Sequence, residues 1–270
     1  MLETSKFSLS KWYMDCVSEE GDVFIAYAAS LRWKGLKINY SSTLRRQHDA
    51  QTEASTSLKR YSAPEVSGDS IHWSSKALGV EGKWMASADP IERTIFESDA
   101  GRVEWRCLHP SAAAEVSTNN QHQLKGFGYV EHLTMSIPPW RLPIDELRWG
   151  RFLSSNDALV WIDWRGASNV KLVFLNGVQI EGAEVTEREV VLEQEKVTLA
   201  HDEDQVLREG PLIKTALSMI PGIQKLIPFR SLHAYECKWR SRGILRQHEN
   251  VSTGWTIHEI VRWPNAVARR

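Results

Sequence analysis

The sequence predicts an all-β protein made of two consecutive antiparallel β-barrel or β-sandwich domains. Many short segments alternate apolar and polar residues, with turn residues roughly every 8 to 12 positions, which is typical of barrels and sandwiches rather than of βαβ units. Tryptophan is abundant, with 12 among 270 residues. Its large apolar surface suits inward rows that line a core or a pocket. A chain of this length can build a substantial core.

The predicted strands are short runs separated by turn residues. In chain order the predicted strands cover residues 11–18, 22–31, 36–44, 55–61, 70–74, 81–88, 94–98, 103–109, 127–137, 148–153, 158–165, 170–175, 178–180, 189–192, 196–201, 231–240 and 254–263. Asn176 and Gly177 separate two of these runs and predict a two-residue hairpin, because both residues tolerate positive φ.

Residues 111–125 form a polar stretch without clear alternation and are read as a linker. We therefore expect an N-terminal β-domain over residues 1–115 and a C-terminal β-domain over residues 125–270. A short helical insert is predicted at 210–227, because Pro211 suits a first helical turn and apolar residues follow at helical spacing up to Pro221. This insert would cover a barrel end as a lid or pack in the core.

Composition excludes several classes of function. Lys and Arg number 33 and Asp and Glu 34, a net charge of -1, which argues against nucleic acid as a partner. No run of 18 apolar residues predicts a transmembrane segment, and no signal peptide is recognisable, so a cytoplasmic location is expected. Cys16, Cys107 and Cys237 are too few and too scattered for a disulfide framework, and no zinc-ligand spacing or cofactor-binding loop is present. We expect no metal and no cofactor; the oligomeric state stays open.

The strongest candidate residue is Glu131, which lies in the strand predicted at 127–137. Side chains alternate across a strand, so Glu131 shares a face with Tyr129 and Leu133, whereas His132 points to the other face. Partial desolvation in an apolar row would favour the protonated acid near neutrality. Alternatively, Glu131 lies at the open end of its strand or pairs with an arginine.

Three further acids interrupt aromatic strand rows. Asp15 lies beside Tyr13, Asp163 beside Trp161, and Glu259 in the row of Trp255. Two such acids that converge in a barrel can act as general acid and general base. Buried acid–arginine pairs are the competing explanation, and core filling is the competing explanation for most of the tryptophans.

Three motifs carry a resemblance to a known family: Lys11-Trp-Tyr-Met-Asp-Cys16, Gly126-Phe-Gly-Tyr-Val-Glu-His132 and Gly254-Trp-Thr-Ile-His-Glu259, with Trp161-Ile-Asp-Trp164 between them. The chain resembles the carotenoid 1,2-hydratase (hydroxyneurosporene synthase) superfamily, which includes tocopherol-cyclase-like proteins and lipocalin-like Diels–Alderases. The resemblance implies two lipocalin-like domains and cofactor-independent chemistry on a polyene or terpenoid. It also carries the family's carboxylate and imidazole onto Glu131 and His132. The chain departs from the family pattern after His132, where Leu133-Thr-Met follows.

The leading hypothesis is acid-catalysed hydration or cyclisation of a hydrophobic small molecule. The predicted catalytic residues are Glu131, His132 and Asp163, and the predicted substrate-binding residues are Tyr129, Trp105, Trp161, Trp164, Trp255, Glu259 and Asp15. A non-catalytic carrier of a hydrophobic ligand is the main alternative, since lipocalin-like barrels hold ligands by burial alone. A carbohydrate-binding sandwich with exposed tryptophans is a third possibility.

Overall fold

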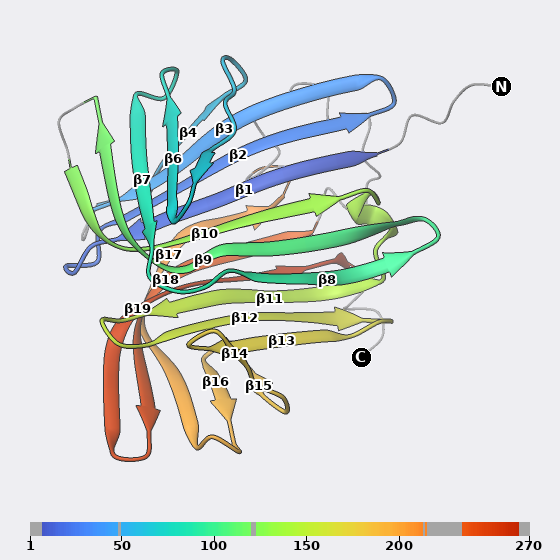
Figure 1. Cartoon of the computed structure of the whole chain (residues 1–270). Coiled ribbons are helices and arrows are strands. Elements are labelled where there is room, and N and C mark those ends of the chain that lie inside the picture. Colours follow the sequence, from blue (N-terminus) through green and yellow to red (C-terminus); the bar gives the residue numbers. More distant parts are fainter. Residues whose placement is uncertain (1–6, 48–49, 120–122, 213, 215–233, 265–270) are drawn as a thin grey trace. The chain divides into compact units, whose positions relative to one another are not determined.

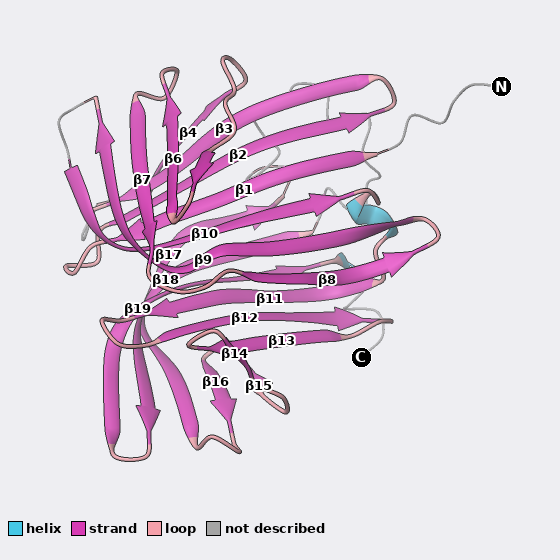
Figure 2. Ribbon diagram, viewed as in Figure 1, coloured by secondary structure: helices cyan, strands magenta, loops and turns pink. Residues whose placement is uncertain are grey.

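The structure is a computed structural model that describes residues 7–47, 50–119, 123–212, 214 and 234–264. Its backbone contacts divide the chain into two units, Met1–Pro138 and Pro139–Arg270. Within the described residues, each unit is built on one antiparallel sheet (Figure 1). Strands dominate, and η1, Pro139–Arg141, is a single helical turn (Figure 2). The predicted all-β class with two consecutive antiparallel domains is confirmed.

The first sheet has the strand order β4-β3-β2-β1-β10-β9-β7-β6-β5 among the described residues, with β8 paired to β9. Its strands are β1 Ser8–Val17, β2 Val23–Trp33, β3 Leu36–Arg46, β4 Glu53–Ser57, β5 Glu65–Ser67, β6 Ser70–Ser75, β7 Val80–Ala86, β8 Ile91–Ser98, β9 Gly101–Thr118 and β10 Gln123–Met135. Phe24 of β2 and Trp73 of β6 share one apolar cluster, although four strands separate β2 from β6 in the sheet. The sheet therefore curls around its own core.

The second sheet has the order β14-β13-β12-β11-β19-β18-β17-β16-β15 among the described residues. Its strands are β11 Ile144–Leu153, β12 Ala158–Gly166, β13 Val170–Leu175, β14 Val178–Gln179, β15 Glu184–Val185, β16 Glu189–Leu192, β17 Val197–Pro211, β18 Tyr235–Gln247 and β19 Asn250–Arg262. Trp161 of β12 and Leu199 of β17 belong to one apolar cluster, so this sheet also curls. The predicted hairpin at Asn176-Gly177 joins β13 to β14, with φ of 50° and 81°.

The segment 111–125, predicted as a linker, instead contributes the end of β9 and the start of β10. Ala112, Ala114 and Val116 are buried and alternate with exposed or half-buried neighbours, a period that short alanine side chains disguise. Because β10 pairs with both β1 and β9, it belongs to the first unit. The boundary falls after β10, at Pro138, instead of within 115–125.

Pro110 lies inside β9 without interrupting it. Residues Gly101–Cys107 of β9 pair with β8, and residues Ala112–Thr118 pair with β7. Proline cannot donate a backbone hydrogen bond, and here it sits where the strand changes its neighbour. The sequence thereby builds a single strand of 18 residues from two half-ladders.

Most of the predicted helical insert at 210–227 lies outside the described residues, and Gly210 and Pro211 end β17. Among the described residues, no helix has the length and apolarity needed to cross a membrane.

Candidate active site

Two carboxylates and two tyrosines face one another on β1 and β10 of the first sheet. The Tyr129 hydroxyl donates to Glu131 Oε2 over 2.8 Å, and the Tyr13 hydroxyl donates to Asp15 Oδ2 over 2.9 Å. The antiparallel register sets Tyr13 opposite Glu131 and Asp15 opposite Tyr129. We call Tyr13, Asp15, Tyr129 and Glu131 the carboxylate–phenol cluster.

The cluster lies on the face of β1 and β10 that points away from the apolar core. Trp12 and Met14 alternate with Tyr13 and Asp15 along β1 and belong to the core cluster. Gly128 of β10 permits this packing, because a Cβ there would lie 2.7 Å from the ring of Trp84. Alternation along the strands thus separates an apolar inner row from a polar, aromatic outer row.

Trp105 of β9 completes the setting of Glu131. Its indole N–H donates to Glu131 Oε2 over 2.6 Å, so the same oxygen accepts bonds from an indole and a phenol. Tyr13, Asp15, Trp105 and Tyr129 are buried, whereas Glu131 is half-buried. Glu131 is therefore the member of this group with the most access from outside the sheet.

Two buried weak acids, the thiol of Cys107 and the phenol of Tyr129, lie beside the carboxylates of the cluster. Burial raises the pKa of the Cys107 thiol well above its usual value, and the charges of Glu131 and Asp15 add to the effect. Burial, with Cys107 and Glu131 nearby, likewise raises the pKa of Tyr129 well above its usual value. The thiol and the phenol therefore remain protonated, and the phenol donates its hydrogen bond to Glu131.

His132 lies on the opposite face of β10 from Glu131, as strand alternation predicts. Its ring stacks on Trp12 with centroids 4.3 Å apart, and its Nε2 lies 2.8 Å from Ser10 Oγ. Burial and the nearby Arg106 lower the pKa of His132 to about 4. The structure does not bring His132 and Glu131 to one reacting centre.

Asp163 and Glu259, both in the second unit, form ion pairs. Asp163 accepts from Arg165 over 2.6 Å, and Glu259 accepts from the buried Lys238 over 2.5 Å. Lys238 also lies 4.8 Å from the ring centroid of Trp149. The sequence analysis left two explanations for these acids, catalysis and pairing with a cation. The structure shows both acids paired with a cation.

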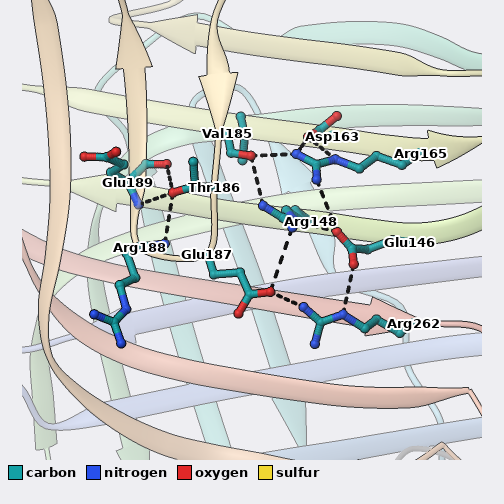
Figure 3. Close-up of polar contacts among 10 residues, drawn as sticks. All are labelled: Glu146, Arg148, Asp163, Arg165, Val185, Thr186, Glu187, Arg188, Glu189 and Arg262. Atoms are coloured by element: carbon teal, nitrogen blue, oxygen red, sulfur yellow. Dashed lines mark hydrogen bonds and ion pairs between the residues drawn. The ribbon is translucent and has the colours of Figure 1, made fainter. Parts of the chain in front are cut away.

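Asp163 belongs to a larger ionic network that joins three strands of the second sheet to the β15–β16 turn (Figure 3). Glu146 accepts bonds from Arg148, Arg165 and Arg262. Arg148 and Arg165 also donate to the carbonyl of Val185, over 3.0 Å and 2.6 Å. This network joins the edge strand β15 and its turn to strands near the middle of the sheet.

The predicted substrate-binding tryptophans of the second unit do not share a face. Trp161 packs in the apolar core, with its ring over Gly150, where a Cβ would lie 2.2 Å from it. Trp164 is buried on the other face of β12. Trp255 holds the guanidinium groups of Arg240 and Arg242 at 4.5 and 5.0 Å from its ring centroid. Core filling and cation–π packing account for these contacts.

A polar cluster that the sequence reading missed lies on β17, β18 and β19. His258 Nε2 is 2.7 Å from Ser241 Oγ, and Ser241 donates to Asp204. The ring of His201 stacks on that of Trp161 and lies tilted against that of His258, and burial together with His258 lowers the pKa of His201 to about 3. His258, whose Nε2 lies 3.8 Å from Asp204 Oδ1, and the hydroxyl group of Ser241 lower the pKa of Asp204 to about 2. In the sequence, His201 and His258 each alternate with apolar residues, and this pattern could have indicated that both side chains are buried.

Among the described residues, no group of three or more His, Cys, Asp or Glu side chains is placed to hold a metal ion.

Comparison with solved structures finds proteins that match nearly the whole chain, among them the following three. Kievitone hydratase from Nectria haematococca matches with a TM-score of 0.52 and 11% identity, over 96% of this chain and 89% of its own. CghA, solved with Sch210972, matches with a TM-score of 0.54 and 10% identity, over 95% and 88%. An AttH-like protein from Nitrosomonas europaea matches with a TM-score of 0.53 and 8% identity, over 95% and 92%.

These three proteins share the fold of this chain at low sequence identity. This likeness confirms the lipocalin-like architecture of two consecutive β-domains that the sequence motifs predicted. No family model matches the sequence, and no curated protein matches it significantly.

Proposed function

We propose that the chain is a cofactor-independent enzyme that hydrates or cyclises a hydrophobic polyene or terpenoid-type substrate, with Glu131 as its proton-transfer group. The observation that carries this proposal is the setting of the Glu131 carboxyl group. It is half-buried in an aromatic row and held by the N–H of Trp105 and the O–H of Tyr129. The lipocalin-like fold, shared with a hydratase, supports an enzymatic role.

The two donors suit a carboxyl group that gives up and recovers a proton. Protonated Glu131 donates to one alkene carbon, which leaves a carbocation on the substrate and a carboxylate on Glu131. The bonds from Trp105 and Tyr129 stabilise this carboxylate and fix its direction. Neighbouring aromatic rings attract the positive charge of the carbocation.

The cycle closes when the proton returns. In hydration, water adds to the carbocation, and the added water then gives one proton to the Glu131 carboxylate. In cyclisation, an internal alkene or hydroxyl group takes the place of water, and the cyclised cation gives its proton back to Glu131. We assign proton transfer to Glu131 alone, because Asp163 is bound by Arg165 and His132 lies on the opposite face.

Isotope labelling tests the proposal. The protein is incubated in D₂O and in H₂¹⁸O with a panel of linear isoprenoid alcohols and conjugated polyenes, and the products are analysed by mass spectrometry. We expect carbon-bound deuterium in the product, and a loss of roughly 100-fold or more in rate for Glu131→Gln. Glu115→Gln, which changes an exposed carboxylate bound to Lys125, is the matched control.

An unchanged rate in Glu131→Gln would overturn the assignment. Native mass spectrometry of the purified protein distinguishes the proposed enzyme from the alternative, a non-catalytic carrier of a hydrophobic molecule. A hydrophobic molecule retained with matching stoichiometry by wild type and Glu131→Gln, and recovered unchanged, would identify a carrier.

A further inference from the structure

A groove of about 430 Å³ opens on the first sheet where β2, β1, β10 and β9 lie side by side. Its lining includes Ser10, Ser30, Arg32, Arg102, Glu104 and Thr134. Ser10 is bonded to His132, whose side chain faces the core side of β10, opposite to Glu131. The groove is therefore separate from the carboxylate–phenol cluster.

We propose that this groove is a second active site, in which Ser10 is the nucleophile and His132 its general base for hydrolysis of a small ester that carries an anionic group. Neither the fold likeness nor the proposed polyene chemistry assigns a role to Ser10. The proposal rests on three features of the groove: a nucleophile–base contact, a fixed base and an uncommitted cation.

The nucleophile–base contact is the 2.8 Å approach of Ser10 Oγ to His132 Nε2. A serine hydroxyl is a weak nucleophile unless a base within hydrogen-bond distance accepts its proton. Both residues are half-buried, and Ser10 lines the groove. Ser10 Oγ can thus meet a ligand while it remains in contact with its base.

The base is held in place and is neutral. The ring of His132 lies almost parallel to that of Trp12, with an interplanar angle of 15° and centroids 4.3 Å apart. Burial and Arg106 keep the pKa of His132 near 4, so the imidazole has a lone pair available at neutral pH. In Ser-His-Asp triads a carboxylate holds the histidine ring in its orientation through a hydrogen bond. Here stacking on Trp12 holds the ring of His132 in place.

The cations of the groove define the ligand class. Arg32 is exposed and has no ion-pair partner among the described residues, whereas Arg102 lies 3.3 Å from Glu104. A guanidinium group binds carboxylate or phosphate through paired hydrogen bonds. A small ester with a terminal carboxylate therefore fits the groove better than a neutral ester.

The reaction is balanced within the groove. Ser10 Oγ bonds to the ester carbonyl carbon as its proton passes to His132 Nε2, and the tetrahedral intermediate expels the alcohol, which takes that proton. Water then attacks the acyl–Ser10 ester, with His132 accepting and returning a proton in the same way. The products are the carboxylic acid and free Ser10.

Two probes test this site in the full chain: a fluorophosphonate reagent, followed by peptide mass spectrometry, and a pair of nitrophenyl esters, mono-p-nitrophenyl succinate and p-nitrophenyl acetate. We expect the reagent to label Ser10 and the succinate ester to be hydrolysed with the higher kcat/KM. Ser10→Ala should remove labelling, and His132→Gln should lower kcat by roughly 100-fold. Arg32→Ala should raise KM for the succinate ester only.

Ser62→Ala is the matched control, because Ser62 is an exposed serine of the same unit that does not line the groove and donates to the carbonyl of Ser74. It should leave labelling and hydrolysis unchanged, as should Glu131→Gln. Circular dichroism confirms that each variant is folded. Absence of label on Ser10 in the wild type, or equal hydrolysis by folded Ser10→Ala, would overturn the proposal. Glu131→Gln should abolish only the polyene chemistry and Ser10→Ala only the ester hydrolysis. Each of the two proposals can therefore be disproved without affecting the other.

Discussion

Tyr13 and Glu131 lie directly opposite each other on β1 and β10, yet their polar groups bond along their own strands and not across the pair. Each tyrosine donates to the carboxylate two residues further along its own strand. Because the strands are antiparallel, the two phenol–carboxylate pairs run in opposite directions, and each carboxylate faces a phenol of the other strand. Four polar side chains are thereby ordered by strand alternation and register alone.

Removal of the phenol that binds Glu131 should destabilise the protein. Tyr129→Phe leaves a half-buried carboxylate without one of its donors, and hydrogen bonds to charged groups contribute about 1.5–3 kcal/mol. We expect a loss of this size in the free energy of unfolding, measured by urea titration at pH 7.

Tyr235→Phe is the control for this experiment. Tyr235 donates to Glu209 over 2.6 Å, but on an exposed surface, so its loss should leave the urea midpoint nearly unchanged. Equal losses in the free energy of unfolding for the two substitutions would contradict this explanation. They would show that burial of the carboxylate–phenol cluster does not strengthen its hydrogen bonds.

Glu146→Gln should remove stability that depends on pH. Burial opposes the charge on Glu146, but bonds from Arg148 and Arg262 outweigh it and hold its pKa below the usual value. A depressed carboxylate pKa gives stability that is present above the unfolded-state pKa and is lost as the pH falls through the folded-state pKa. At pH 7 the substitution should cost about 1.5–3 kcal/mol, because the buried Glu146 loses charge-assisted hydrogen bonds from the half-buried Arg148 and Arg262.

The difference between wild type and Glu146→Gln should shrink as the pH falls below about 4.3, the unfolded-state pKa of a glutamate, and through the lower folded-state pKa. Denaturant unfolding over a pH series measures this. A difference that stays constant down to pH 3 would show that packing, and not charge, explains the effect. Glu115→Gln, at an exposed pair, should show no such difference.

His201→Phe should flatten the pH dependence of stability. Burial and His258 lower the pKa of His201 to about 3, so only the unfolded chain binds this proton between pH of about 6.5 and 3. Wild type should therefore lose about 1.4 kcal/mol per pH unit from this residue as the pH falls through that window. Phenylalanine keeps the stack with Trp161 and carries no proton.

We expect the unfolding free energy of His201→Phe to fall less between pH 7 and pH 5 than that of wild type. Neither ring nitrogen of His201 has a hydrogen-bond partner in the described structure, so the substitution should not weaken the protein at pH 7. Parallel pH profiles for the two proteins would mean that His201 titrates normally.

Gly150→Ala should destabilise the second sheet. A Cβ at this position would lie 2.2 Å from the ring of Trp161, so the ring must move out of the core. Such overpacking costs about 1–3 kcal/mol. Thermal unfolding measures the loss, and the double variant with Trp161→Leu should be less destabilised than the sum of the two single variants. Simple additivity would argue against the clash.

Strand alternation explains why part of the site was predictable. The sequence alone placed Glu131 with Tyr129 and put His132 on the opposite face, because neighbours two apart share a face wherever a strand is regular. The hairpin at Asn176-Gly177 was equally local, since its turn needs two residues that tolerate positive φ. The predicted linker failed because alanine alternation in β9 has little hydrophobic contrast.

By itself, the sequence determined the β class, most strand positions and the face of each candidate side chain, because these follow from the two-residue period of an extended backbone. Only the tertiary structure decided which side chains meet. Glu146 bonds to Arg262 from 116 residues away, and Ser10 meets His132 from 122 residues away. Such pairs depend on strand order and register in the sheet, which local patterns do not specify.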